Sequence, residues 1–252
     1  MNPGALPQEA TAFLILFARI GAVLMLLPVF SEDAVPGRIR LLIALGLTAG
    51  LWGLLGTRTM PAAADGAALP FVLVTELLIG LGMGLLVKMM FQAIAIAGAI
   101  VSLQVGLSSA VIFDPSQGGA APLLSKFVSV TAAVVCMAFA VHHLWIGAIV
   151  RSYTIFPVGV LPPAGDFATV ALHTATGAMA LGVSLAAPLL VYGIVFNVAL
   201  GLAARLAPAI QVFFVAQPLN LLLGLALFAT VLGTMMTGFA TAMASWMQTG
   251  WG

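Results

Sequence analysis

The stretch from Phe167 to Ala204 carries no formal charge when His173 is neutral, and no charged residue follows Arg205. Segments of this kind can be placed in lipid only as helices or closed barrels, because each backbone amide there needs a partner within the protein. The stretch is longer than the roughly 20 residues that cross a bilayer as one straight helix. Since Pro188 falls inside it, we expect a kinked helix in this part of the chain.

The composition extends this constraint to the whole chain. Hydrophobic residues make up 63% of the sequence and charged residues only 6%, whereas soluble domains carry about 25% charged residues. The chain is therefore predicted to be an all-α, polytopic membrane protein. Its 27 glycines and 14 prolines predict kinked helical hairpins that pack closely and break often. A net charge of +1 offers no basic surface for nucleic acid.

The sequence lacks the motifs of the common enzyme classes. It contains no phosphate-binding loop, dinucleotide fingerprint, Ser-His-Asp spacing or His-Glu-xx-His helix. Cys136 is the single cysteine and lies in an apolar run, so we expect a small buried hydrophobe there. His142 and His143 are adjacent and would point to different helix faces, which argues against a metal site. We expect neither catalysis nor a cofactor nor a metal.

The segment from Gly98 to Pro122 interrupts the apolar pattern in the middle of the chain. Gly106 allows the backbone to bend, and Pro115 and Pro122 prevent a continuous helix. Irregular backbone at membrane depth is tolerated only when it is buried in protein or lines an aqueous cavity. We predict a pore-lining or gate element here, with an ordinary loop as the alternative. The residues assigned to it are Gly106, Ser108, Ser109, Phe113, Asp114, Pro115, Gly118, Gly119 and Pro122.

Several charged or amide side chains occur within or beside the apolar regions. Arg19 falls inside the first apolar segment, Thr11 to Val29, so we expect a buried partner, or else snorkelling to the interface. Glu76 and Lys88 lie twelve positions apart, too far to pair along one helix, so each needs water, another helix or another subunit. The residues expected in buried polar contacts or in assembly are Arg19, Glu76, Lys88, Asn197, Arg205, Gln211 and Gln217.

The pattern also predicts where helices end and approach one another. A short span is expected from Leu41 to Leu55, followed by a linker from Gly56 to Pro70. Arg151 to Phe167 is expected to be an interfacial loop, with Trp145 and Tyr153 suited to the headgroup region.

Gly80 and Gly84 form a Gly-xxx-Gly pair within the third apolar region. Such a pair allows the backbones of two helices to approach closely. In so glycine-rich a chain the pattern is weak evidence by itself.

Three classes of function are left: a channel or gate for a large polymer, a small-solute transporter, and a structural assembly subunit. Abundant glycine, uneven helix breaks and the polar, glycine-rich central segment favour the gate. Inverted repeats would favour the transporter, and we find none in the sequence.

Six blocks resemble one known family. In order, they are ARIGAVLMLLPVF, VPGRIR, GLGMGLL, AGAIVSLQVGLSSAVIFDP, HHLWIGAIVRSYTIFPVG and NVALGLAARLAPAIQVFFVAQPLNLLLGL. They run from about residue 18 to about residue 225 and together resemble the FliR family of the flagellar type III export apparatus. The virulence counterparts of that family, the SctT branch, belong to injectisomes. The stretch from Gln211 to Asn220 looks more flagellar than injectisome-like.

The resemblance implies a subunit of an export gate in the bacterial inner membrane, at the flagellar basal body. It implies FliP-like and FliQ-like subunits as direct partners, FlhB-like and FlhA-like proteins nearby, and unfolded flagellar proteins as substrates. Residues 1–160 would be FliP-like and residues 161–252 FliQ-like. The plug of the family maps onto Gly106 to Pro122. An injectisome export gate is the alternative, and a small-solute transporter the more distant one.

On this reading the mechanism is physical rather than chemical. Phe113 is the candidate stopper, because a hydrophobic constriction can close a pore by excluding water. Gly118 and Gly119 would let the loop swing aside for an unfolded substrate. The alternative for Phe113 is that its ring packs into a neighbouring helix.

Overall fold

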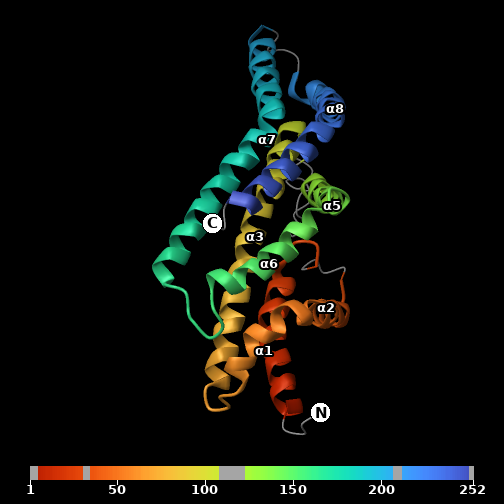
Figure 1. Ribbon diagram of the computed structural model, residues 1–252. Coiled ribbons are helices and arrows are strands. Elements are labelled where there is room, and N and C mark those ends of the chain that lie inside the picture. Colours follow the sequence, from red (N-terminus) through yellow and green to blue (C-terminus); the bar gives the residue numbers. More distant parts are fainter. Residues whose placement is uncertain (1–4, 31–34, 108–122, 207–211, 250–252) are drawn as a thin grey trace. The chain divides into compact units, whose positions relative to one another are not determined.

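The computed structural model describes residues 5–30, 35–107, 123–206 and 212–249, and within these every regular element is a helix (Figure 1). The helices are α1 (Ala5–Leu26), α2 (Gly37–Ala63), α3 (Leu69–Val105), α5 (Leu123–Ala138), α6 (Val141–Ile155), α7 (Ala164–Leu206) and α8 (Val212–Thr249). The predicted all-α class is confirmed.

Most of these helices have the length and composition of membrane spans. In the described part of the chain, five helices are long and apolar enough to cross a membrane, namely α1, α2, α3, α7 and α8. A sixth candidate is the broken pair formed by α5 and α6. The chain is therefore a multi-pass membrane protein, as predicted. At 1.5 Å per residue, the 37 residues of α3 extend about 55 Å, well beyond the roughly 30 Å of the hydrocarbon core.

The predicted boundaries of the second span are wrong. Helix α2 begins at Gly37, directly after Pro36, and continues to Ala63, into the first half of the predicted linker. It buries Ala44, Thr48, Leu55, Gly56, Thr59 and Ala63. These positions recur at helical spacing, so packing extends the helix although glycine, threonine and proline disfavour it.

The predicted loop from Arg151 to Phe167 is too long. Helix α6 continues to Ile155 and α7 begins at Ala164, which leaves residues 156–163 between them. Pro157 ends α6 because proline cannot supply the backbone N–H that the next turn needs. Pro163 stands just before α7. A backbone N–H at this position would have no acceptor within the helix, so proline, which lacks one, is tolerated there.

The chain forms two compact units whose segments alternate along the sequence. Unit 1 comprises residues 1–90, 142–175 and 247–252, and unit 2 comprises residues 91–141 and 176–246. Helices α3 and α7 each contribute one part to either unit. The predicted division at residue 160 separates a FliP-like part from a FliQ-like part and makes no statement about compact units. It therefore stays a prediction.

In unit 1, α1 packs closely against the first part of α3. A Cβ atom added to Gly80 would lie 2.5 Å from the carbonyl oxygen of Arg19 and 2.7 Å from the Cβ of Ala22. One added to Gly84 would lie 2.7 Å from the Cβ of Leu26. Only glycine permits this approach, so the predicted Gly-xxx-Gly contact is confirmed.

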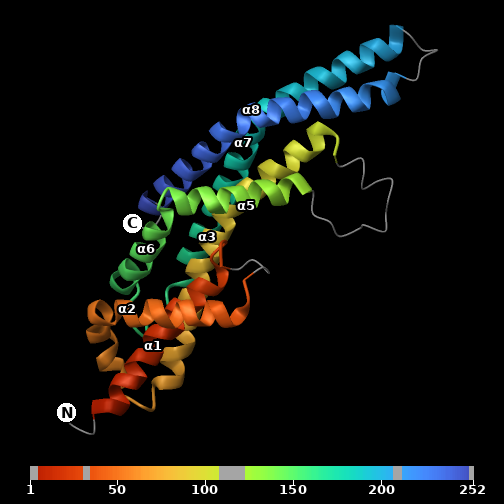
Figure 2. The ribbon, with the colours of Figure 1, turned by 90° about the vertical axis from the view of Figure 1, so that its right-hand side faces the viewer.

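In unit 2, α7 and α8 form an antiparallel hairpin, and α5 lies beside the last turns of α3 (Figure 2). The ring of Phe239 on α8 meets Phe91 on α3 edge to face, with centroids 5.2 Å apart. Phe228 on α8 meets Phe127 on α5 in the same way at 6.5 Å. These aromatic pairs join the hairpin to the helices on either side of the predicted gate loop.

Candidate functional site

The predicted gate loop begins at a well-defined helix end. Gly106, the first residue after α3, has φ 86°, a left-handed conformation that strains any residue with a Cβ. Its N–H donates to the carbonyl oxygen of Leu103 at 3.1 Å, and the N–H of Leu107 donates to that of Ser102 at 3.1 Å. These two bonds make a Schellman motif, which satisfies carbonyl groups that a helix end leaves open.

A polar cluster from α7 and α8 contacts the same last turn of α3. The side-chain amide of Asn220 donates to the carbonyl oxygen of Gln104 at 3.2 Å. The hydroxyl of Tyr192 donates to the side-chain oxygen of Asn220 at 2.8 Å. Gly193 packs directly on the side chain of Gln104, and a Cβ on Gly224 would lie 3.0 Å from Val105. The hairpin therefore fixes the point where the loop leaves α3.

The other end of the loop is held by α5. The hydroxyl of Ser125 donates to the carbonyl oxygen of Ala95 at 3.0 Å. A Cβ on Gly98 would lie 2.7 Å from the Cα of Ser125, so the two helix backbones nearly touch. Residues 106–122 are thus bounded by two helix ends packed within one compact unit.

The rest of the predicted gate lies outside the described residues, and its roles stay predictions. These residues are Ser108, Ser109, Phe113, Asp114, Pro115, Gly118, Gly119 and Pro122. Gln211, one of the predicted polar contacts, also lies outside them.

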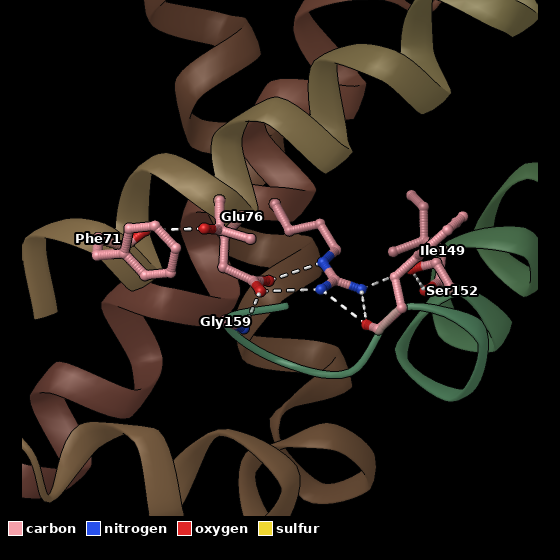
Figure 3. A network of polar contacts seen from close by, with 8 residues as sticks. Phe71, Glu76, Ile149, Ser152 and Gly159 are labelled. Carbon is pink, nitrogen blue, oxygen red and sulfur yellow. Dashed lines mark hydrogen bonds and ion pairs between the residues drawn. The ribbon is translucent and has the colours of Figure 1, made fainter. Parts of the chain in front are cut away.

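A second polar arrangement lies in unit 1, around Arg19 (Figure 3). Arg19 and Glu76 are both fully buried. The Nε of Arg19 donates to Glu76 Oε2 at 2.7 Å, and its Nη2 donates to Glu76 Oε1 at 2.8 Å. This two-point geometry between a guanidinium and a carboxylate is the strongest form of charge-assisted hydrogen bond. Of the predicted polar residues, the structure brings these two together.

The remaining donors of Arg19 are also used. Nη1 donates to the hydroxyl of Ser152 at 3.2 Å, and both Nη1 and Nη2 donate to the carbonyl oxygen of Phe156 at 3.0 Å. All five N–H groups of the guanidinium therefore have an acceptor. The ring of Tyr153 lies 4.0 Å from the guanidinium carbon, a cation–π distance.

Glu76 links the same cluster to the loop between α6 and α7. Its Oε1 accepts the backbone N–H of Gly159 at 3.2 Å. Figure 3 shows the carboxylate of Glu76 beside Gly159, with Ser152 at the opposite side of the network. The buried charges are thus neutralised and hydrogen-bonded by α1, α3, α6 and residues 156–159, as charges in a low-dielectric interior require.

Sequence reasoning did not single out the partners on α6 and in the loop. Two of them are backbone groups, of Phe156 and Gly159, and any residue type supplies those. Tyr153 and Trp145 are 4% and 3% exposed, so the prediction that they suit the headgroup region is wrong: α6 faces the protein at these positions. The spacing of Trp145, Ile149, Ser152 and Tyr153 along one helix face was the available signal.

The other predicted polar residues lie on the surface of the chain. Lys88 and Arg205 are exposed, and Arg205 sits in the last turn of α7, where a cation complements the helix dipole. Asn197 is exposed, and its side-chain amide donates to the carbonyl oxygen of Gly193 in its own helix at 2.8 Å. Gln217 is half-buried. Their roles in assembly stay predictions.

Residues 10–246 match the family described as bacterial export proteins, family 1. The chain is 39% identical to the flagellar biosynthetic protein FliR of Caulobacter vibrioides over 229 residues, which cover 91% of each chain. It is 32% identical to FliR of Escherichia coli K12 over 216 residues, 85% of this chain and 81% of that one. FliR of Bacillus subtilis is 29% identical over 213 residues, 83% of this chain and 82% of that one.

Proposed function

Since the chain belongs to the bacterial export proteins, family 1, we propose that it is a subunit of the flagellar type III protein export gate in the bacterial inner membrane. It helps to form the channel through which unfolded flagellar proteins leave the cytoplasm. The observation that carries this proposal is the 39% identity to a flagellar biosynthetic protein FliR over 91% of the chain.

The geometry of unit 2 supports a gating role for residues 106–122. Both ends of this segment are fixed, by the Schellman motif after α3 and by the Ser125 contact at the start of α5. Because the two helix ends are packed independently of the segment between them, movement of that segment need not disturb their packing. Phe113 is its one aromatic residue and serves as the hydrophobic stopper.

The subunit works with FliP-like and FliQ-like subunits and beside FlhB-like and FlhA-like export proteins. Residues 1–160 correspond to a FliP-like part and residues 161–252 to a FliQ-like part. The many large apolar side chains exposed on α2, α7 and α8 support this assembly, because a surface of this kind is covered by lipid or by other helices.

A gene deletion distinguishes this function from its alternatives. We expect the deletion strain to lack filaments, motility and exported flagellar proteins, and a plasmid-borne copy to restore all three. Motility that survives the deletion, together with a growth defect on one solute, would instead establish a transporter. Loss of virulence-protein secretion with intact filaments would establish an injectisome subunit.

Co-purification tests the partners separately. A tagged chain expressed with its export-gate companions should purify with FliP-like and FliQ-like subunits in a fixed ratio. If the chain purifies alone after gentle extraction while motility depends on it, the gate role holds only through partners other than those proposed.

A further inference from the structure

A cavity of about 560 Å³ lies within unit 1, between α3, the end of α6 and the start of α7. Ligand sites in proteins are commonly about 300–1,000 Å³ in volume. The walls include Leu78, Met83, Phe156, Pro163, Phe167 and Val170. Asp166 is the one charged residue among the described residues that line it.

The cavity opens onto an apolar surface that is exposed in the isolated chain. Leu78 is 50% exposed and Val170 is 38% exposed, and both belong to helices of membrane-spanning length and composition. Water is held in a cavity by two to four polar partners, which these apolar walls do not supply. An empty apolar cavity would forfeit the dispersion contacts of its lining. An acyl chain of a membrane lipid would fill the cavity with the smallest loss of free energy.

The walls of the cavity are held in place before any ligand arrives. The ring of Phe167 lies so close to Gly82 that a Cβ there would be 2.8 Å from it. The carbonyl oxygen of Phe156 accepts two bonds from Arg19, and the N–H of Gly159 donates to Glu76. The buried charge cluster thus holds the 156–163 loop at Phe156 and Gly159. A cavity whose walls are already in position binds a ligand at a lower entropic cost.

Asp166 gives the site a polarity that an ordinary lipid contact lacks. It is exposed in the first turn of α7, directly before the uncharged run from Phe167 to Ala204. The carboxylate therefore stands at the polar end of an apolar helix, directly beside the cavity that the apolar residues line. An anion at this position attracts an ammonium group and repels a lipid of net negative charge.

We propose that this cavity binds one acyl chain of a phospholipid whose headgroup carries an amine, with the ammonium group against the Asp166 carboxylate. The apolar walls select the chain and the carboxylate selects the headgroup. The site does not depend on the gate function, because it lies in unit 1 and uses none of the residues assigned to the gate loop.

The test uses the full chain with its co-expressed partners, in nanodiscs that contain phosphatidylethanolamine and phosphatidylglycerol. In parallel samples, one or the other lipid carries a photoreactive group in an acyl chain, and labelled peptides are mapped by mass spectrometry. We expect phosphatidylethanolamine to label residues 78–86 and 155–170 more strongly than phosphatidylglycerol does. Equal labelling by both lipids, or labelling spread evenly over α3, would overturn the proposal.

Three variants sharpen this result. Val170→Trp fills the cavity and should remove most of the labelling there, whereas Val74→Trp should leave it unchanged, because Val74 is 54% exposed and lies outside the lining.

Asp166→Asn should lower the preference for the amine lipid by about two- to fivefold, the range that an exposed ion pair supplies. An unchanged preference would exclude the carboxylate contact. Cross-links from this region to a partner polypeptide, without lipid labelling, would show that a protein helix fills the cavity instead.

Discussion

At the scale of single residues, Arg19 and Glu76 show how a membrane protein keeps charge in its interior. Each buried ion costs several kcal/mol to desolvate, and the five hydrogen bonds of the guanidinium offset that cost. The bonds join residues that are 57 and up to 137 positions apart in the sequence. The cluster therefore specifies which segments of unit 1 meet, more than it adds to net stability.

Arg19→Leu should lower the stability of unit 1 by about 3–5 kcal/mol, because it leaves Glu76 as an uncompensated buried charge. The yield of assembled complex and its thermal unfolding in detergent measure this. Arg58→Leu is the matched control: Arg58 is exposed and donates to the hydroxyl of Thr154 at 3.0 Å, so its loss should cost less than about 1 kcal/mol. Equal yields for the two variants would show that the buried pair does not hold the fold.

Gly80→Ala should loosen the contact between α1 and α3. The added methyl group would lie 2.5 Å from the backbone oxygen of Arg19, so a helix must shift, at a cost of about 1–3 kcal/mol. Gly46→Ala on α2 is the control, because nothing lies within 4 Å of the added Cβ. Alanine in place of this helical glycine should leave the stability unchanged or raise it slightly. The comparison is made by thermal unfolding, and a Gly80 variant as stable as its control would refute the close approach.

At the scale of helices, the sequence predicted the all-α, multi-pass class, because lipid leaves few choices for an uncharged chain. The prediction of the end of α2 was wrong. A linker was predicted there because of the residues Gly56, Thr57, Arg58, Thr59 and Pro61. Packing of Thr59 and Ala63 in unit 1 carries the helix further. Local composition cannot report such a tertiary contact.

For the polar sites too, the sequence identified single residues but not their tertiary partners. The sequence identified Arg19 and Glu76 as buried polar residues, because charge in an apolar run is rare, but it could not pair them across two helices. It also placed Gly106 at the start of an irregular segment, while Tyr192 and Asn220 were missed as its supports. Those contacts involve three helices, and one sequence contains no signal that chooses among them.

The Schellman motif after α3 yields a prediction about this element. Gly106→Ala places a Cβ at φ 86°, which costs roughly 1–2 kcal/mol and changes the direction in which the loop leaves the helix. We expect assembled complexes with raised conductance of the closed gate. Gly201→Ala in α7 is the control, because nothing lies within 4 Å of that position and its φ is not positive. If both variants conduct as little as the parent, the helix end does not set the position of the loop.

At the scale of the whole molecule, the proposed gate segment and the stabilising contacts of the described residues belong to different parts of the chain. Packed helices and the Arg19 cluster hold unit 1, and aromatic pairs with close glycine contacts hold the helices of unit 2. Residues 106–122 connect α3 and α5, which are already joined through Gly98 and Ser125. Changes within that segment should therefore affect closure of the channel without affecting assembly.

Deleting Ser108 to Gly119, or replacing Phe113 with alanine, should leave the complex assembled and make the resting gate leak. The helices that flank the loop supply the packing, so losing the loop costs little stability, whereas losing a large apolar ring admits water to a narrow pore. The deletion should leak more than Phe113→Ala, because it removes the whole obstruction. Phe71→Ala, at a 57% exposed phenylalanine of α3, is the matched control and should not leak. Membrane conductance of cells that express the complete gate provides the measurement, with export of flagellar proteins expected to continue. If both gate variants assemble and stay as tight as the Phe71 control, residues 106–122 do not form the seal, and the segment is an ordinary connection between two helices.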